Sequence, residues 1–302
     1  MNKFAAILHY MSIVAIIYSY STHNATSTSQ SPTITLCTQP QSVVHKNISD
    51  NNWELPEYPP SSIILKYKLF TVSYNKKMHI PNWVAWKMDK NRIKECLVAN
   101  NNGGYTGRYI QDPNLKEYGP IPNDYAKSGY DRGHMCPADY CYGTNYIKCW
   151  YMSNFCPQKP KLNRYGSWKR LEDKGKTWVF YEGNNESCEG FEVLYTVCGP
   201  VPGDIIDYIV TKRQGPDGKP FKIAVPGSYF KAFLGIKDQK IAGIGFICKQ
   251  DGSAEGMSIK KLEEIINMQL FSAARTELPE EYNIAVNMEP NEDDWPGWET
   301  VL

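Results

Sequence analysis

The chain carries three short blocks of residues whose side chains could together cleave a phosphodiester bond. They are Asp131–His134 (Asp-Arg-Gly-His), Ser153–Gln158 (Ser-Asn-Phe-Cys-Pro-Gln) and Leu162–Asn163. A neutral imidazole such as that of His134 can take a proton from water near neutral pH. An amide oxygen such as that of Asn163 can bind Mg²⁺ when water and substrate phosphate complete the coordination shell. The blocks therefore predict a metal-assisted hydrolytic site, with His134 as general base and Asn163 as metal ligand.

Structural interpretations compete with these chemical ones. A single histidine can cap a turn, and an asparagine just before a helix can serve as its N-cap. Gly133, however, would permit a tight backbone turn that presents the His134 imidazole. Three blocks in this order, each with chemistry suited to the same reaction, favour catalysis over separate structural roles.

The order of the blocks resembles that of the DNA/RNA non-specific endonucleases, which are sugar-non-specific nucleases with a ββα-metal (His-Me finger) site. The matching stretches read SGYDRGHMCPADY, WYMSNFCPQKPKLNRYGSWKRLED and YTVCGP, and weaker similarity extends over residues 61–275. The resemblance implies an α+β fold in which a central, mainly antiparallel sheet is flanked by helices. It also implies a divalent cation, Mg²⁺ or else Mn²⁺ or a related ion, as cofactor.

The resemblance assigns further roles to single positions. Arg108, in the run GRYIQDP, would stabilise phosphate as part of the catalytic set, and Glu172 would orient metal-bound water. The family usually separates the ligand asparagine from this glutamate by one residue fewer than the nine positions between Asn163 and Glu172. Because one residue turns an α-helix by about 100°, a loop or π-bulge near Tyr165 must absorb the extra residue. Otherwise Glu172 is a solvated helix residue.

Polar residues around the blocks are candidates for shaping the site or binding substrate. Arg132 either binds phosphate or buttresses the site, and Asn154 and Gln158 should hold its geometry, with Gln158 near the substrate. Lys159 and Lys161 open a segment, 158–176, that has seven basic residues against two acidic ones. Such side chains contact the nucleic-acid backbone and read no base sequence. We therefore expect DNA and RNA as substrates.

The N-terminus is typical of a secretory signal peptide. Lys3 precedes an apolar run over residues 4–17, and polar residues follow. This predicts a secreted protein without stable membrane contact once the signal is removed. A signal-anchored form, or one held in a secretory compartment, is the alternative. The net charge of +1 and the hydrophobic content of 42% suit a folded chain that is not globally basic.

Composition divides the chain into four parts. Residues 1–20 form the expected signal peptide, and residues 21–60 a polar linker or N-terminal arm. Residues 61–276 form the expected endonuclease domain. Residues 277–302 form a tail with eight acidic and no basic residues. We expect the tail to be disordered or to pack outside the site.

Nine cysteines all follow the predicted signal, so we expect several disulfides in an oxidising compartment. The odd count leaves one thiol free or paired between chains, and the chain is compatible with a homodimer. No Cys-x-x-Cys pair occurs, which argues against a zinc site. Sequons at Asn24, Asn47 and Asn185 predict glycosylation in a eukaryotic secretory pathway.

Local patterns predict the elements that position these residues. Periodicity favours helices over Ser167–Gly175 and Ser258–Arg275. The many Gly, Asn, Asp and Pro residues between positions 99 and 133 predict a long surface loop there. Alternating β-branched and aromatic residues predict strands over Ile63–Tyr74, Asn82–Met88, Thr177–Tyr181, Phe191–Val197, Lys222–Leu234 and Ile241–Lys249.

Together these observations predict a secreted, Mg²⁺-dependent endonuclease that hydrolyses DNA and RNA with little sequence preference and leaves 5′-phosphate ends. Two alternatives remain. The altered spacing between Asn163 and Glu172 is compatible with a catalytically impaired, nuclease-like binding module. The same chemistry would also serve a phosphodiesterase for small nucleotides, which a comparison of substrates would distinguish.

Overall fold

The computed structural model describes residues 52–302, except 58, 60, 102–106, 142–145, 180, 184–185 and 189. The predicted signal peptide, most of the polar arm, and the sequons at Asn24, Asn47 and Asn185 lie outside the described residues. In the described part of the chain, no helix combines the length and the apolar character that a membrane crossing requires.

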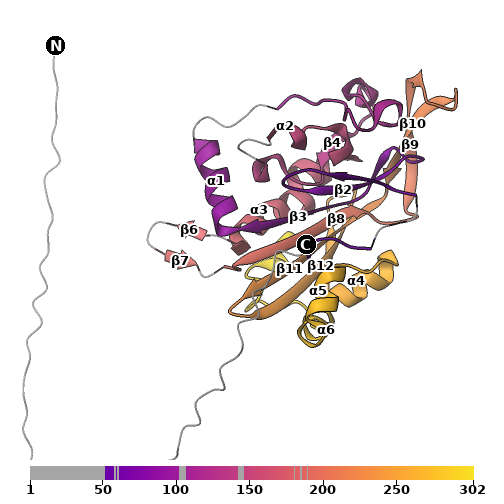
Figure 1. Cartoon of the computed structure of the whole chain (residues 1–302). Helices are drawn as coiled ribbons and strands as arrows, with labels where there is room; N and C mark the ends of the chain where they lie inside the picture. The colour runs from indigo at the N-terminus through magenta and orange to yellow at the C-terminus, as the bar shows by residue number, and fades with distance from the viewer. Residues whose placement is uncertain are drawn as a thin grey trace, which may run out of the picture. The chain divides into compact units, whose positions relative to one another are not determined.

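A seven-stranded sheet forms the centre of the fold (Figure 1), and every neighbouring pair of its strands is antiparallel. The strands lie in the order β1-β2-β3-β8-β11-β12-β13. Helices cover the sheet, so the predicted α+β class with a mainly antiparallel sheet is confirmed. The strand bounds are Ile63–Lys66 (β1), Thr71–Asn75 (β2), Ile80–Asp89 (β3), Val193–Pro200 (β8), Ser228–Lys237 (β11), Lys240–Lys249 (β12) and Ala254–Met257 (β13).

Side chains alternate between two hydrophobic cores on the two faces of this sheet. On β11, Tyr229 and Phe233 join one core, whereas Phe230 and Leu234 join the other. Figure 1 shows α1 and α3 on the first side and α4 to α6 on the second. The helix bounds are Lys90–Asn101 (α1), Tyr146–Cys149 (α2), Ser167–Val179 (α3), Ile259–Ile266 (α4), Ser272–Glu277 (α5) and Pro279–Asn287 (α6).

Three two-stranded units lie outside the central sheet. The hairpin that matters most for function pairs β4 (Asp131–His134) with β5 (Phe155–Gln158). A π-helical turn, Lys161–Tyr165, follows β5 and leads into α3. The other two units pair β6 with β7 and β9 with β10, with bounds Tyr181–Gly183 (β6), Glu186–Cys188 (β7), Ile205–Gln214 (β9) and Pro220–Pro226 (β10).

Helix α3 is longer than the sequence predicted. We expected it to end at Gly175, but it continues to Val179, so the predicted strand Thr177–Tyr181 is wrong over most of its length. Gly175 does not end the helix. It is needed for close packing, because a Cβ there would lie 2.7 Å from the Tyr140 hydroxyl. Burial of Trp178 outweighs the strand preference of these residues.

Two predicted strands are each divided in the structure. Ile63–Tyr74 is the hairpin of β1 and β2, and Lys222–Leu234 breaks at Gly227 between β10 and β11. There the chain leaves the β9–β10 ribbon and enters the central sheet, and the Gly227 amide donates to Asp204 O. The predictions for β3 and β12 are confirmed within two residues at each end. Strand β9 and helix α1 were not predicted.

The predicted helix Ser258–Arg275 is two helices, α4 and α5. Ser258 caps the start of α4 by accepting from the Lys261 amide, and Asn267 ends it in the left-handed region, with φ 48°. The buried Glu263 carboxylate accepts a hydrogen bond from the Leu270 amide at 2.7 Å and pairs with Arg275 at 2.9 Å. These contacts stabilise the link between the two helices. The hydrophobic periodicity of the sequence does not predict them.

Both ends of the described chain pack onto the fold. Trp53, upstream of the boundary that we placed at residue 61, is buried, and its Nε1 donates to Glu277 at 3.0 Å. At the other end, Trp295 is buried, and the Arg170 guanidinium donates to the carbonyl oxygens of Val301 and Leu302. The C-terminal residues therefore lie against α3.

The close contact of β3 with β8 gives a prediction about stability. A Cβ at Gly199 would lie 2.3 Å from the backbone oxygen of Asn82 and 3.0 Å from the Cα of Trp83. Gly199→Ala should therefore force the two strands apart and lower the unfolding free energy by about 1–3 kcal/mol. Gly215→Ala, where the nearest atom is 3.4 Å away, is the matched control. Equal melting temperatures for the two variants would contradict this packing.

Candidate active site

His134 is the last residue of β4, and β5 fixes its backbone. The ring packs between Phe155, at a centroid distance of 4.3 Å, and Trp150, at 4.9 Å. The Trp168 indole of α3 donates to His134 O at 3.0 Å. Nε2 is enclosed and has no hydrogen-bond partner in the described part of the chain, whereas Nδ1 is not enclosed. The hairpin and α3 thus present the Nδ1 edge of the imidazole to the surface.

Position 133, next to His134, requires a glycine because a side chain there would clash with Gln158. A Cβ at Gly133 would lie 1.9 Å from Gln158 Oε1, because the two residues lie on paired strands. Gln158 is fully buried, and its amide has no partner among the described residues. Gln158 therefore packs beneath β4, the strand that carries His134, and its predicted place near the substrate stays a prediction.

Burial sets the protonation state of His134. Desolvation lowers the pKa of its imidazole to about 4, and Asp139 opposes this effect only in part. The ring is therefore neutral throughout the neutral pH range. A neutral imidazole with an accessible nitrogen can accept a proton from water, which is what a general base requires.

Asn163 lies in the π-helical turn Lys161–Tyr165, at the place where we expected a loop or π-bulge before α3. Its Nδ2 donates to Asp131 Oδ2 at 3.1 Å, and the Arg164 guanidinium donates two hydrogen bonds to the same carboxylate, at 2.5 and 2.7 Å. Burial acts to raise the pKa of Asp131, but the hydrogen bonds from Arg164 and Asn163 outweigh it and hold that pKa below its usual value. Asp131 therefore joins the turn to β4.

The remaining atoms of Asn163 suit a hard divalent cation. With Nδ2 on Asp131, the half-buried side chain keeps Oδ1 free of hydrogen bonds in the described part of the chain. An amide oxygen is a ligand that Mg²⁺ accepts when water and phosphate complete its shell. The described residues contain one close group of alternative ligands, Cys136, Cys141 and Cys149. These are soft thiols, and two of them form a disulfide.

Glu172 follows the buried Leu171 in α3, and its own side chain is half-buried. Burial raises the pKa of its carboxyl to about 7, and the charge of Lys231 is the strongest influence that lowers it again. Its carboxylate has neither a hydrogen bond nor an ion pair in the described part of the chain. The side chain is half-buried, so burial raises the pKa of a carboxylate that solvent still reaches.

The two arginines have different surroundings. Arg132 donates to Pro122 O at 2.5 and 3.2 Å, and its guanidinium lies over the rings of Tyr109 and Tyr125. These contacts support the buttressing role and leave little of the group for phosphate. Arg108 is exposed, with no partner among the described residues. Its neighbour Tyr109 packs on Trp150, which anchors this segment beside the His134 ring.

Asn154 holds the loop that follows His134. Its Oδ1 accepts from the Cys136 amide at 2.9 Å, and its Nδ2 donates to the carbonyl oxygens of Cys136 and Cys149 at 2.8 and 3.1 Å. The side chain is fully buried. This amide therefore links the chain after β4 to the chain before β5, and it fixes the direction in which His134 leaves the hairpin.

The basic segment 158–176 has a less uniform surface than its sequence suggested. Lys159 and Lys161 are exposed and form no ion pair in the described part of the chain, and Lys159 lies 5.7 Å from the Tyr130 ring centroid. The other five cations bind protein groups, namely Arg164, Lys169, Arg170, Lys174 and Lys176. Lys159 and Lys161 are thus the cations of this segment that remain for phosphate.

Four residues of the site escaped the sequence analysis. Trp168 holds His134 O, Trp150 packs on its ring, and Lys231 lies beneath α3. Gln250 accepts from the Lys159 amide at 2.7 Å and donates to Pro157 O at 3.0 Å, which fixes the end of β5. Trp168 and Trp150 stand beside the recognised motifs, but no sequence signal marks Gln250 or Lys231.

The cysteines are mostly buried. Cys141 and Cys149 form a disulfide that spans the segment between β4 and β5. Five further cysteines are buried, namely Cys96, Cys136, Cys156, Cys198 and Cys248. Cys37 lies outside the described residues. Of the several disulfides that we predicted, the described part of the chain shows this one pair.

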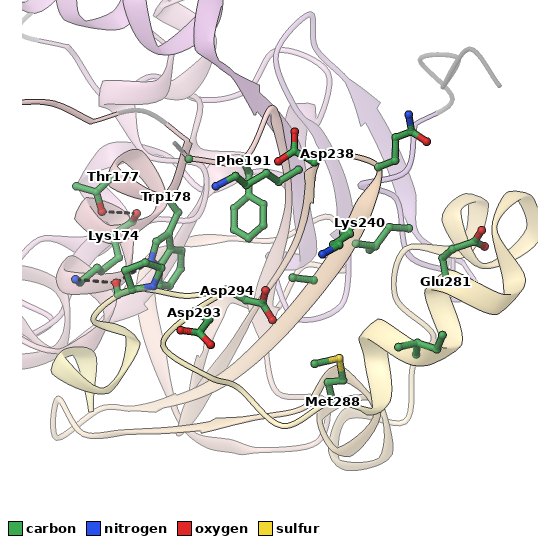
Figure 2. Close-up of a pocket in the computed structure, with 17 residues that line it drawn as sticks. Lys174, Thr177, Trp178, Phe191, Asp238, Lys240, Glu281, Met288, Asp293 and Asp294 are labelled. Carbon is green, nitrogen blue, oxygen red and sulfur yellow. Dashed lines mark hydrogen bonds between the residues drawn. The ribbon is translucent and has the colours of Figure 1, made fainter. Parts of the chain in front are cut away.

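A large cavity of about 890 Å³ lies away from these residues (Figure 2). The end of α3, the β11–β12 turn, α6 and residues 293–296 line it, with Trp178 and Phe191 on its apolar side. None of the candidate site residues lines it. The cavity is therefore separate from the candidate site around His134 and Asn163.

Comparison with known proteins assigns the chain to a family of nucleases. A sequence profile of the DNA/RNA non-specific endonucleases matches residues 54–277, and the chain belongs to this family. A crystal structure of an EndoG/EndoGI complex matches with a TM-score of 0.55 at 19% identity, covering 71% of this chain and 87% of that chain. At that identity the likeness shows the shared fold.

Two relatives illustrate the similarity. A nuclease from Nostoc sp. is 30% identical over 178 residues, which are 57% of this chain and 54% of the relative. The mitochondrial nuclease EXOG of Danio rerio is 30% identical over 212 residues, which are 65% of this chain and 53% of the relative. The chain thus spans about half the length of the curated relatives that it matches.

The pKa values of Glu172 and His134 predict a pH profile. The Glu172 carboxylate is lost as the pH falls below about 7, whereas His134 stays neutral down to about pH 4. If the carboxylate orients water, kcat/KM should rise with pH to a plateau, with a midpoint near 7. Glu172→Gln should lower the plateau about tenfold or more and abolish the midpoint near 7. An unchanged midpoint in this variant would assign the titration to another group.

Proposed function

We propose that this chain is a metal-dependent endonuclease that hydrolyses DNA and RNA with little sequence preference. The observation that carries the proposal is the junction at Asp131, which brings Asn163 of the π-helical turn next to the strand that ends in His134. Membership of the DNA/RNA non-specific endonuclease family supports the same reaction. Exposed Lys159, Lys161 and Arg108 would contact phosphates, which carry no base information.

In the proposed mechanism, the residues divide the tasks of hydrolysis. Neutral His134 accepts the proton of the attacking water, and Arg108 stabilises phosphoryl charge. Asn163 would hold the divalent cation, which supplies charge stabilisation at the scissile phosphate and the leaving 3′-oxygen. Departure of that oxygen leaves 5′-phosphate ends. Glu172 orients water, and Asn154 and Arg132 keep the loops of the site in place.

The π-helical turn bears on the competing proposals. The altered spacing is the basis for the alternative of a catalytically impaired binding module, but the chain forms a π-helical turn just before α3, and Glu172 is half-buried on that helix. This favours turnover. For the phosphodiesterase alternative, plasmid nicking and RNA digestion should be compared with hydrolysis of a small chromogenic diester. Faster hydrolysis of the small diester would favour that function.

The secretory route remains a proposal based on the sequence. The segment that suggests it lies outside the described residues, and several relatives carry the names of mitochondrial nucleases. Expression with the native N-terminus would decide between the two routes. Secreted protein lacking about 20 N-terminal residues would support a cleaved signal peptide. Mitochondrial protein processed at another position would contradict it.

Removal of the proposed base gives the first functional prediction. His134→Ala should lower plasmid nicking by at least about 10²-fold, because proton transfer by a positioned base contributes roughly that much. Nucleic-acid binding, measured in chelator, should stay near the parent value. His79→Ala, which removes a histidine outside the site, is the control. A His134→Ala rate within tenfold of the parent would exclude His134 as the base.

Removal of the proposed ligand should affect metal dependence. Asn163→Ala should lower activity and shift the Mg²⁺ titration to higher concentration, with partial recovery at excess Mg²⁺, since water and phosphate ligands remain. The exposed Asn123→Ala should titrate like the parent, and chelator should abolish cleavage by both proteins. If Asn163→Ala gave an unchanged Mg²⁺ titration, the ligand would have to be sought elsewhere.

A further inference from the structure

A buried cation lies under the site. Lys231 is 1% exposed and occupies the position on β11 between Tyr229 and Phe233, on the face that α3 covers. Its ammonium has no hydrogen-bond partner in the described part of the chain, and no ion pair within 4.0 Å there. An unpaired ammonium is costly to bury. Stability by itself therefore does not account for a lysine at this position.

Lys231 contacts the helix that supports both catalytic candidates. Its Nζ lies 3.8 Å from the ring centroid of Trp168, whose indole donates to His134 O. Glu172 follows Trp168 by four residues, so both side chains point from α3 towards the same part of the sheet. The ammonium thus lies beneath α3, close to the residue that fixes His134 and to Glu172.

The other titratable groups near Lys231 are neutral. Burial raises the pKa of Cys198, its register partner on β8, to about 12 and that of Cys248 on β12 to about 11. Burial also raises the pKa of Cys136 well above its usual value. Glu172 is therefore the group whose charge Lys231 can compensate.

Other charges act on Glu172 more weakly than Lys231 does. Lys169 and Lys176 favour its carboxylate, and Asp139 disfavours it. Both lysines are already paired, Lys169 with Asp173 and Lys176 with Asp139. Lys231 is buried and without such a partner, so solvent screens its charge least.

We propose that Lys231 is a positioning residue for the hydrolytic reaction, in which its buried ammonium holds Glu172 as a carboxylate beside the site. The inference rests on the proposed endonuclease function and deepens it. Lys231 does not touch the substrate and acts through Glu172. The competing explanation is a lysine that merely fills space between β11 and α3.

Lys231→Met separates these explanations, because methionine keeps the length of the side chain and removes the charge. Removing a buried charge that lacks a partner also removes the cost of its desolvation. A positioning role predicts an unchanged or higher melting temperature together with lower activity. Substantial loss of folding in the variant would show a structural role and overturn the proposal.

Kinetics on the full chain give the second measurement. Without the ammonium, the pKa of Glu172 should rise. If this pKa rises by about one pH unit, about tenfold less of the carboxylate form is present at pH 6. We expect kcat at pH 6 to fall about tenfold with KM within about twofold, and the midpoint of the pH profile to move upward. Lys249→Met, at an exposed position on β12, should match the parent. An unchanged midpoint in Lys231→Met would overturn the proposal.

A double-mutant cycle tests whether Lys231 acts through Glu172. In a Glu172→Gln background, Lys231→Met should lower kcat by no more than about twofold, because the group that it serves is absent. A further tenfold loss would mean that Lys231 acts elsewhere. Failure of the proposed function is distinguishable, since the parent itself would then show no Mg²⁺-dependent cleavage of plasmid DNA.

Discussion

The hydrogen bonds at Asp131 are the constraint on which the candidate site depends. Asp131 opens β4, and its carboxylate receives Asn163 and Arg164 from the π-helical turn. One carboxylate therefore sets the position of the turn relative to the strand that carries His134. The same bonds occupy the amide nitrogen of Asn163 and leave its oxygen for a cation. Arg164, which looked like part of a phosphate-binding segment, is used to hold this junction.

A second constraint is the low dielectric beneath α3. Desolvation keeps the His134 imidazole neutral and brings the pKa of Glu172 to about 7, so burial shifts two titratable groups of the candidate site. Trp168 connects His134 with Lys231, because its indole donates to His134 O while its ring lies against the Lys231 ammonium. The titratable groups whose burial costs stability thus lie around one helix, α3, and groups with shifted pKa values are common at functional sites.

The surface above this buried layer is suited to a polymeric substrate. Arg108, Lys159 and Lys161 are exposed, whereas the other cations of segment 158–176 are bound to protein groups. The C-terminal residues account for part of this, since they take up Arg170 and Lys174 on α3. A few free cations at an open surface can contact a phosphate backbone of any sequence. This arrangement is consistent with the proposed lack of base preference.

The sequence by itself determined the family and the candidate residues of the site, because these depend on residue type and order along the chain. Asp131–His134 and Leu162–Asn163 indicated the base and the ligand, and alternation indicated most strands of the sheet. Tertiary structure decided what depends on contacts between distant residues. It buried Gln158 under Gly133, continued α3 past Gly175, and placed Gln250 against the end of β5. Lys231 shows the same limit: its strand pattern is ordinary, and only packing against α3 makes its charge matter to the site.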